Sequence, residues 1–258
     1  MSEPGAGPLP ERPIFIGTKS RARALSAPSW RKYWEASVLA PSTAVEFGER
    51  IRSFSPLTPS PEPFAQAAPE VALPTQIDSL QRLFRRRRST RLFGDTRLRT
   101  KDLGRLFSAF SAHNERRTYP SAGGMYPVHV FAMILHAQEP WNGKAVRYEP
   151  TSHSLGVMGS LPAREDVERF CSLDDGIHPQ MIVVFVIYPD ELERKYGERA
   201  GRFALMEVGH AAQSLALRIT KSGMIGYEIG GVQDTAIKDI LGLSGTGGLI
   251  AHGYACGR

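Results

Sequence analysis

The chain has 258 residues, of which 41% are hydrophobic, and it carries a formal net charge of +6 at pH 7. This length and apolar content allow one large domain with an appendage, while the charge suggests an anionic partner without choosing among nucleic acid, an acidic peptide and a phosphorylated cofactor. No stretch approaches the roughly 20 apolar residues of a membrane helix, and the N-terminus lacks a signal-peptide pattern, so we expect a cytoplasmic protein without membrane contact.

Residues 1–75 are predicted to form a Pro-rich arm, because they hold twelve of the nineteen prolines. Four aromatic side chains give this arm apolar surface to bury: Trp30, Tyr33, Trp34 and Phe47. The stretch 26–37 favours a short helix capped by Ser26 or Ser29. We expect the arm to wrap over the domain or over a second subunit, and its role as a dimer clasp, a lid or a docking tail is left open.

Residues 76–258 are predicted to form the main domain. Helical patterns occupy 77–86, 100–110 after Thr100 as N-cap, 165–172, 198–222 and 234–242. Strand patterns occupy 128–137, a hairpin over 144–159, 180–188, 225–231 and 249–257. This mixed order predicts an α+β fold with a largely antiparallel sheet, not a regular βαβ repeat. Neither a dinucleotide loop nor a nucleotide-triphosphate loop is present.

The first candidate site is a basic segment at the end of the helix 77–86. Guanidinium groups and a hydroxyl gather in Arg87, Arg88, Ser89 and Arg91, and this pattern suits a phosphate or another planar anion. A solvated charge run at a helix end would look the same. Because no aromatic interleaving or known module accompanies the arginines, we expect no nucleic-acid partner.

The second candidate is RTYPSAGGMYP, residues 117–127, directly before the predicted strand 128–137. Two prolines bracket small residues and a glycine pair, which are more special backbone positions than a plain surface turn needs. The pattern indicates that another group comes close to the backbone here.

Two further signals stand near the end of the chain. Gly230 and Gly231 follow a predicted strand, where backbone N–H groups could face a ligand, although a tight turn is the commoner explanation. Arg258 ends the chain with a guanidinium that would ordinarily be exposed. Each signal is weak by itself.

Together, the segments RRSTRLF, PSAGGMYP, KYGERAGRFALMEVGHAAQSLAL, IGG and the closing GR resemble the FMN-dependent nitroreductase superfamily, and more narrowly its SagB-type branch of azoline dehydrogenases. The resemblance covers roughly residues 80–258 and leaves out the arm. It implies an α+β sandwich with a central, mostly antiparallel sheet flanked by helices. It also implies a homodimer that binds FMN at an interface built from both chains.

The resemblance implies a role for each candidate cofactor residue. Those against the isoalloxazine ring or its ribityl chain are Pro120, Ser121, Ala122 and Gly123. Those on the phosphate and the pyrimidine edge of the ring are Arg87 or Arg88, Ser89, Arg91 and Arg258. Those near N5 of the ring are Gly230 and Gly231. Arg91 is the candidate cation for the reduced ring, since a fixed charge near N1 and O2 stabilises the anion that forms there.

Lys195 and Tyr196 are the candidate catalytic residues, because the resembling azoline dehydrogenases use a Lys-Tyr pair at this motif. A thiazoline or oxazoline becomes aromatic by losing a proton from the α-carbon and a hydride from the neighbouring ring carbon. FMN takes the hydride, and Lys195 is the expected base, with Tyr196 orienting or sharing the proton. Without the resemblance, ERKYGER would simply be the charged first turn of a helix.

The implied function is FMN-dependent oxidation of peptide azolines to thiazoles or oxazoles, with a cyclodehydratase or leader-binding protein as partner. Two alternatives stay open: a nicotinamide-dependent nitro- or quinone reductase, and a catalytically silent scaffold of a peptide-modifying complex. Glu207 and His210 lie three residues apart on the long predicted helix, but a second copy of this pair is absent, so we expect polar groups in the core or at an interface and no metal site.

Overall fold

The computed structural model describes residues 28–53, 72–74 and 76–258. Its central sheet consists of β3 (Val128–Ile134), β4 (Lys144–Glu149), β5 (Ser154–Ser160), β6 (Met181–Ile187), β7 (Ile225–Ile229) and β8 (Leu249–Gly257). The spatial order is β5-β4-β3-β6-β8-β7, and every neighbouring pair is antiparallel. The predicted α+β fold with a largely antiparallel sheet is therefore confirmed.

The central strand β6 shows why the sheet is covered on both faces. Its sequence MIVVFVI is rich in β-branched side chains, which favour strands, and every one of its residues is buried. Successive side chains of a strand point to opposite faces. Val183 and Phe185 accordingly join one apolar core, while Ile182 and Val184 join another.

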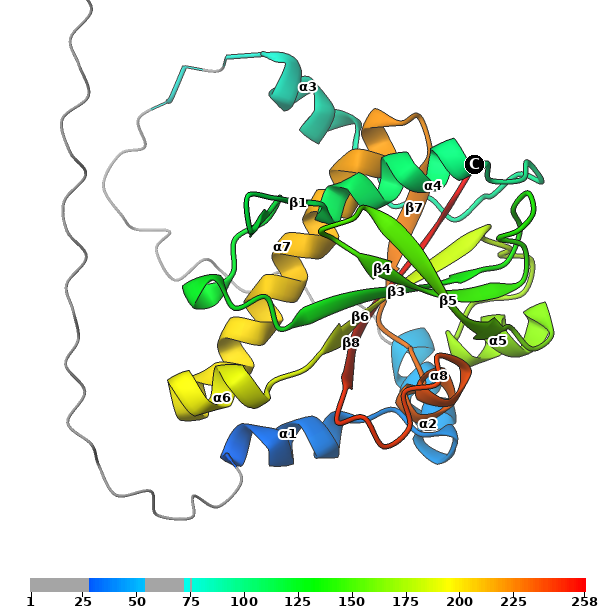
Figure 1. Cartoon of the computed structure of the whole chain (residues 1–258). Helices are drawn as coiled ribbons and strands as arrows, with labels where there is room; N and C mark the ends of the chain where they lie inside the picture. The colour runs from blue at the N-terminus through cyan, green and yellow to red at the C-terminus, as the bar shows by residue number, and fades with distance from the viewer. Residues whose placement is uncertain (1–27, 54–71, 75) are drawn as a thin grey trace, which may run out of the picture.

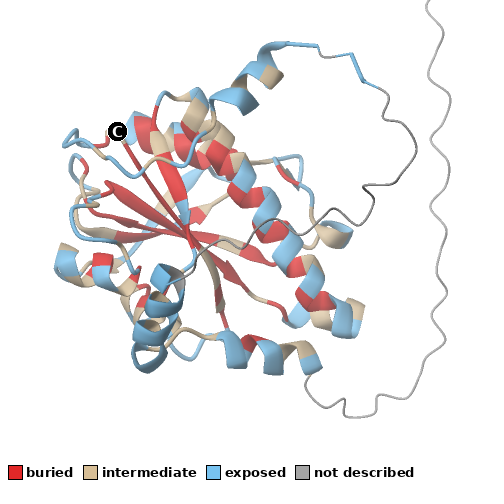
Figure 2. Cartoon of the chain, turned by 180° about the vertical axis from the view of Figure 1, so that it is seen from behind, coloured by how far each residue is buried: buried red, intermediate tan, exposed pale blue. Residues whose placement is uncertain are grey.

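Helices close each face of the sheet (Figure 1). The helices of the described residues are α1 (Ser29–Ser37), α2 (Pro41–Ser53), α3 (Ser79–Arg86), α4 (Thr100–Phe107), α5 (Arg164–Phe170), α6 (Asp190–Tyr196), α7 (Ala200–Lys221) and α8 (Asp234–Ile240). Of these, α3 has no buried residue and lies beside α7, away from the sheet. The long helix α7 and α4 bury their apolar sides in one core, whereas α5 and α8 contribute to the other. Figure 2 shows the buried residues concentrated in the sheet and along the inner side of α7.

The helix predicted over 198–222 begins later than expected. α7 starts at Ala200, and residues 197–199 form a separate 3-10 turn. The interruption lies at Gly197, which has a backbone φ of 55° and ends α6. Lys195 and Tyr196 therefore form the last turn of a short helix and do not belong to the first turn of the long one.

Helix starts also differ from the sequence prediction. Pro28 holds the N-cap position of α1, and Ser29 is the first helical residue, with its hydroxyl donating to Glu198. At α4 the N-cap is Arg99, whose backbone N–H donates to the Asp102 carboxylate at 3.1 Å. Ser26 lies outside the described residues. The partner at α1, Glu198, is distant in the sequence, whereas the cap of α4 is a local pair of Arg99 with Asp102.

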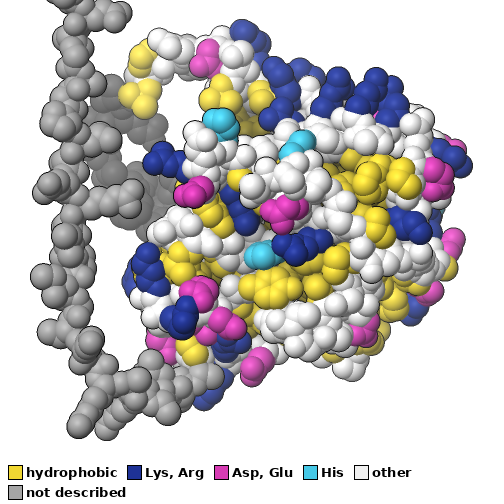
Figure 3. Space-filling view, in the orientation of Figure 1, with side chains coloured by type: hydrophobic (Ala, Val, Ile, Leu, Met, Phe, Trp, Pro, Cys, Tyr) yellow, Lys and Arg dark blue, Asp and Glu magenta, His cyan; other side chains and the backbone are white. Residues whose placement is uncertain are grey.

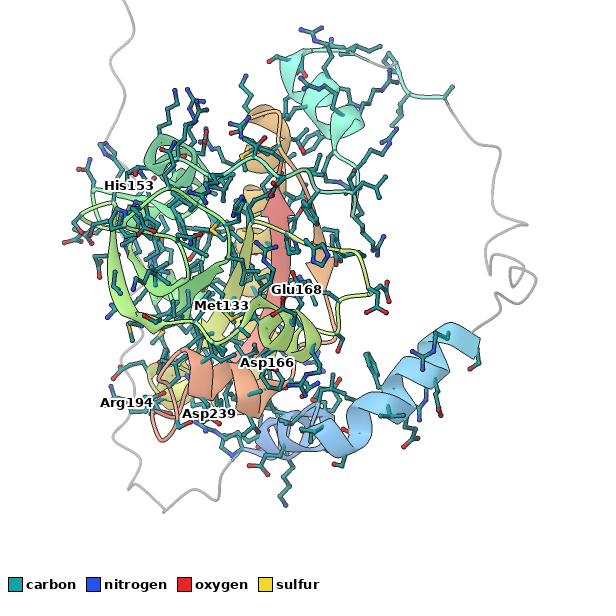
Figure 4. The ribbon with its side chains drawn as sticks, turned by 90° about the vertical axis from the view of Figure 1, so that its right-hand side faces the viewer. Met133, His153, Asp166, Glu168, Arg194 and Asp239 are labelled. Atoms are coloured by element: carbon teal, nitrogen blue, oxygen red, sulfur yellow. The ribbon has the colours of Figure 1, made fainter. Side chains whose placement is uncertain are left out.

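Part of the predicted arm lies against the domain. Figure 4 shows α1 and α2 at the same end of the molecule as α8, the helix that carries the labelled Asp239. Trp34 of α1 is buried and joins the core beside α7. The backbone N–H of Leu39 donates to Asp234 at 3.2 Å. The helix α2 was not predicted from the sequence. Over residues 28–53, 72–74 and 76–258, no helix combines the length and apolar character needed to cross a membrane.

Candidate active site

The segment before β3 has an unusual backbone. Gly123, Gly124 and Tyr126 all have positive φ, at 62°, 68° and 51°, a region that glycine enters easily and other residues rarely. The Ser121 hydroxyl accepts a hydrogen bond from the Tyr126 N–H at 2.8 Å and so closes the turn. This turn holds the backbone of Gly123 exposed at the surface.

Lys195 and Tyr196 come directly against this turn. A side chain at Gly123 would begin 2.5 Å from Lys195 Nζ and 2.6 Å from Tyr196 Oη, so both functional groups converge on the space that the missing side chain leaves. Tyr196 is half-buried and packs edge-on against Phe203, with ring centroids 4.9 Å apart. Lys195 is exposed, and its Nζ lies 5.2 Å from the centre of the Tyr196 ring. The structure therefore brings together two candidate motifs that lie far apart in the sequence, the Pro120–Gly123 segment and the Lys195–Tyr196 pair.

Arg117 supports the turn through hydrogen bonds and was not identified from the sequence. Its Nη1 donates to the Tyr119 hydroxyl at 2.8 Å and to the Val128 carbonyl at 2.6 Å, while its backbone N–H donates to the Tyr126 hydroxyl at 3.1 Å. These bonds tie both ends of the segment together. The sequence offered no signal for this role beyond the position of Arg117 at the start of the unusual stretch.

Glu207 is the second supporting residue, and it is buried on α7. Its Oε1 accepts from the Val128 N–H at 3.4 Å, and burial raises the pKa of its carboxyl group to about 7. A cavity of about 290 Å³ lies beside it, lined by the Pro120–Ala122 stretch and by α7 residues that include Phe203 and His210. Glu207 and His210 were predicted to be polar groups in the core or at an interface; Glu207 is buried and His210 is exposed.

The basic segment lies along the edge strand β7. The Thr90 N–H donates to the Gly226 carbonyl at 3.1 Å, and the Arg91 guanidinium lies 4.5 Å from the centre of the Tyr227 ring. Arg88 donates to the Arg85 carbonyl at 3.0 Å, at the end of α3. Arg87 is half-buried, and Ser89 is exposed. These side chains line one edge of the sheet and leave polar groups accessible there.

The last residue, Arg258, is not simply exposed to solvent as a terminal arginine ordinarily would be. Its Nη2 donates to the buried Asp102 carboxylate at 2.8 Å, and its backbone N–H donates to Gln180 at 2.9 Å. Burial alone would raise the pKa of Asp102, but the hydrogen bonds from Arg99 and Arg258 outweigh it and lower that pKa below its usual range. Within the described residues, Arg258 Nε is buried without a hydrogen-bond partner, so the guanidinium retains a donor for an anion.

Gly230 and Gly231 differ from each other. A side chain at Gly231 would begin 2.8 Å from Ser172 Cβ, and the Ser172 hydroxyl donates to the Gly231 carbonyl at 2.6 Å. Gly230 is exposed, and a side chain there would meet nothing within 4 Å. Gly230 lines a cavity of about 200 Å³ together with Trp34 and Leu205. The structure therefore leaves Gly230 open to a ligand and packs Gly231 against Ser172.

The candidate residues form two groups that α7 separates within one chain. The first combines the Pro120–Gly123 turn with Lys195 and Tyr196; the second follows β7 from Arg258 at one end to Gly230 at the other. The cavities beside the two groups share no lining residue. Figure 1 shows α6 beside one end of α7 and β7 beside the other. The bare backbone at Gly123 and the unpaired Arg258 Nε fit the flat ring and the anionic tail of a flavin nucleotide.

Among the described residues, no group of three or more His, Cys, Asp and Glu side chains is arranged to hold a metal ion.

Comparison with known proteins places the chain in a family. The model of the nitroreductase family matches residues 84–257. A protein of Methanocaldococcus jannaschii that is named as a nitroreductase is 29% identical over 178 residues, which cover 67% of this chain and 89% of that protein. The microcin B17-processing protein McbC of Escherichia coli is 29% identical over 147 residues, which cover 54% of each chain.

Solved structures show the same fold. A chain of the Escherichia coli microcin synthetase McbBCD complex, with truncated pro-MccB17 bound, matches with a TM-score of 0.66 and 23% identity over 89% of this chain and 92% of that chain. A nitroreductase-like protein of Ralstonia eutropha matches with a TM-score of 0.59 and 19% identity over 74% of this chain and 87% of that chain.

The similarity to McbC supports the SagB-type branch predicted from the sequence. Members of the nitroreductase family are oxidoreductases that generally bind flavin. Because the family model spans well over half of its length, this chain belongs to the nitroreductase family.

Proposed function

We propose that the protein is an FMN-dependent dehydrogenase that oxidises peptide thiazolines or oxazolines to thiazoles or oxazoles in the biosynthesis of a modified peptide. The observation that carries the proposal is the convergence of Lys195 Nζ and Tyr196 Oη on the bare backbone of Gly123. A base and a phenol beside a bare backbone suit removal of a proton next to a flat cofactor. The similarity to McbC, a microcin B17-processing protein, supports a peptide substrate.

The residues along β7 would hold the anionic end of FMN. Arg258 offers its unpaired Nε, and Arg87, Arg88 and Ser89 add donors from the segment beside the strand. Arg91 would provide positive charge near the pyrimidine edge of the ring. Pro120, Ser121, Ala122 and Gly123 would face the ring or its ribityl chain, and Gly230 would approach it near N5. Gly231 would contribute indirectly. It packs against Ser172, and this contact would fix the backbone position of the neighbouring Gly230.

FMN supplies an acceptor for the hydride that leaves the azoline ring. Lys195 Nζ takes the proton from the α-carbon, because its amine reaches the space above Gly123 from the end of a flexible stem. Tyr196 Oη reaches the same space and orients the substrate or shares the proton, while packing against Phe203 fixes its ring. Dioxygen or another acceptor would then receive the electrons.

A homodimer would complete the site, since α7 separates its two groups within one chain. The exposed side of α7 between them carries Leu205 and Met206, which are 44% and 51% exposed, and a side chain at Gly209 would meet nothing within 4 Å. A second copy seated on this side would bring the β7 group of one chain to the Gly123 group of the other. Light scattering should therefore show a dimer when flavin is bound, and a flavin-loaded monomer would contradict this arrangement.

A partner protein that makes the azoline, such as a cyclodehydratase, or that binds a leader peptide would deliver the substrate. Figure 3 shows a row of Lys and Arg side chains along one edge of the molecule, in the area of α3 and α4. Its exposed members include Arg85, Arg86, Lys101 and Arg105. An acidic leader or an acidic partner surface would meet this edge favourably. Neutralising these four residues should weaken co-purification, and unchanged association would contradict the role.

The proposed function is tested by adding FMN and then an azoline-containing peptide to the purified protein. We expect a yellow protein and a peptide that loses two hydrogen atoms for each ring oxidised. A protein that cannot be loaded with flavin would instead be a silent scaffold. Fast NAD(P)H oxidation with nitroaromatics, and none with azoline peptides, would identify a nitro- or quinone reductase, which the similarity to the Methanocaldococcus jannaschii protein favours.

A further inference from the structure

The arm helix α1 contacts the short helix that carries the candidate catalytic pair. Arg31 Nε donates to Glu193 Oε1 at 2.7 Å and its Nη2 donates to Oε2 at 2.8 Å, so the guanidinium binds this carboxylate with two parallel hydrogen bonds. The same Nη2 reaches Asp190 at 2.9 Å. The Glu193 side chain is only 13% exposed. A two-pronged, partly buried ion pair fixes geometry far better than an exposed one.

A second contact lies on the other side of the pair. The backbone N–H and the hydroxyl of Ser29 donate to the two carboxylate oxygens of Glu198, at 2.9 and 2.8 Å. Next to it, the Trp30 ring lies over Gly201, where a side chain would begin 2.8 Å from the ring. Helix α1 therefore holds the chain at Glu193, before the catalytic pair, and again at Glu198, after it.

The segment between these two contacts needs such support. Lys195 is exposed, so packing does not fix its direction. Gly197, directly after Tyr196, has φ 55° and ψ −130°, a conformation reserved almost entirely for glycine, and glycine allows the backbone to rotate at low cost. If α6 pivoted about Gly197, both functional groups would leave the space above Gly123.

We propose that Arg31 is a positioning residue for Lys195 and Tyr196, and that α1 acts through Arg31 and Ser29 as a clamp that holds α6 against the Gly123 turn. Its effect on turnover rests on the proposed function, whereas the clamp itself does not.

The test compares Arg31→Ala with the wild type and with Lys32→Ala, which removes a charge from an exposed position of the same helix. The full-length, FMN-loaded protein is followed by hydrogen exchange and by turnover of an azoline peptide. In Arg31→Ala we expect amides 190–199 to exchange about tenfold faster while β6 stays protected, and kcat to fall about tenfold with little change in KM. Arg31→Lys keeps the charge without the planar fork and should lie between, and Lys32→Ala should match the wild type.

Ser29→Ala provides a milder variant should Arg31→Ala lower protection throughout the sheet. We expect exchange over 190–199 to rise about two- to threefold, since one hydroxyl bond is lost. Unchanged exchange in this segment for both variants overturns the clamp whatever the substrate is. Faster exchange with wild-type kcat overturns the positioning role. A wild-type protein that leaves azoline peptides unchanged overturns the proposed function instead, and the exchange result then decides the clamp alone.

Discussion

Gly123 and Gly231 were both predicted from the sequence to lie against the cofactor, but the structure gives them different surroundings. A side chain at Gly123 would begin 2.5 Å from Lys195 Nζ and 2.6 Å from Tyr196 Oη, so this glycine makes room for functional groups. A side chain at Gly231 would begin 2.8 Å from Ser172 Cβ, so this glycine makes room for packing.

The difference shows what a glycine pair in a sequence specifies. It specifies that no side chain of its own fills the space beside the backbone, so that another group can occupy this space. That group comes from a distant part of the chain. Only at Gly123 is the neighbour chemically able to act on a substrate, and this glycine also has a positive φ of 62°. Variants on each side of the comparison should therefore change different properties.

The largest effect is expected where the functional groups themselves are removed. Lys195→Ala should lower kcat for an azoline peptide about a thousandfold, because it removes the proposed base, and Tyr196→Phe should lower it about tenfold. Flavin absorbance should stay, since neither side chain is proposed to hold FMN. Lys221→Ala, at the exposed end of α7, should match the wild type. Wild-type rates in both variants of the pair would end their proposed role.

The next largest effect is expected from two glycine variants that distinguish backbone strain from displacement of Lys195 and Tyr196. Gly123→Ala and Gly124→Ala both force a side chain into positive φ, at a cost of about 1–2 kcal/mol. A side chain at Gly124 would meet nothing within 4 Å, whereas one at Gly123 would displace Lys195 and Tyr196. We expect Gly123→Ala to lower kcat at least about tenfold more than Gly124→Ala does. Equal rates in the two variants would mean that the close approach has no catalytic consequence.

The sequence predicted the elements that depend on local pattern. Strand β6 and helix α7 were found because their apolar residues recur at strand and helix spacing, and the sheet was assigned as largely antiparallel from the order of elements. The turn at Pro120–Gly123 was recognised because its prolines and glycines restrict the backbone locally. Helix α2 was missed, since the prolines around it suggested an irregular arm.

Contacts between distant segments could not be predicted in this way. The ion pair of Arg31 with Glu193 joins residues 162 positions apart, and nothing in either neighbourhood indicates the other. Arg117 and Glu207 support the candidate site through hydrogen bonds to Val128, a partner that only the folded chain supplies. The division of the candidate residues by α7 likewise follows from the fold and not from the spacing of the motifs.

A smaller effect concerns the support under Gly123. Burial raises the pKa of Glu207 to about 7 from a usual value of 4.5. Because the folded state holds this proton more tightly than the unfolded state does, the free energy of unfolding falls as pH rises from about 4.5 to about 7, by at most about 3 kcal/mol. Glu207→Gln should therefore be more stable than the wild type at pH 8 and similar to it near pH 4.5, as read from urea unfolding. The exposed control Glu139→Gln should leave the pH profile unchanged, and an unchanged profile in Glu207→Gln would contradict the assignment.

The smallest effect belongs to the packed glycine and completes the comparison. Gly231→Ala forces Ser172 to move and should lower the free energy of unfolding by about 1–2 kcal/mol, with flavin absorbance and kcat of the folded protein near wild type. Gly230→Ala meets nothing within 4 Å, so its stability should stay within about 0.5 kcal/mol of the wild type, while its affinity for FMN should fall because the new methyl group faces the proposed ring position. Urea unfolding and flavin titration measure the two properties separately. Loss of flavin from Gly231→Ala at unchanged stability would reverse the assignment and put Gly231, as the family resemblance implies, against the ring.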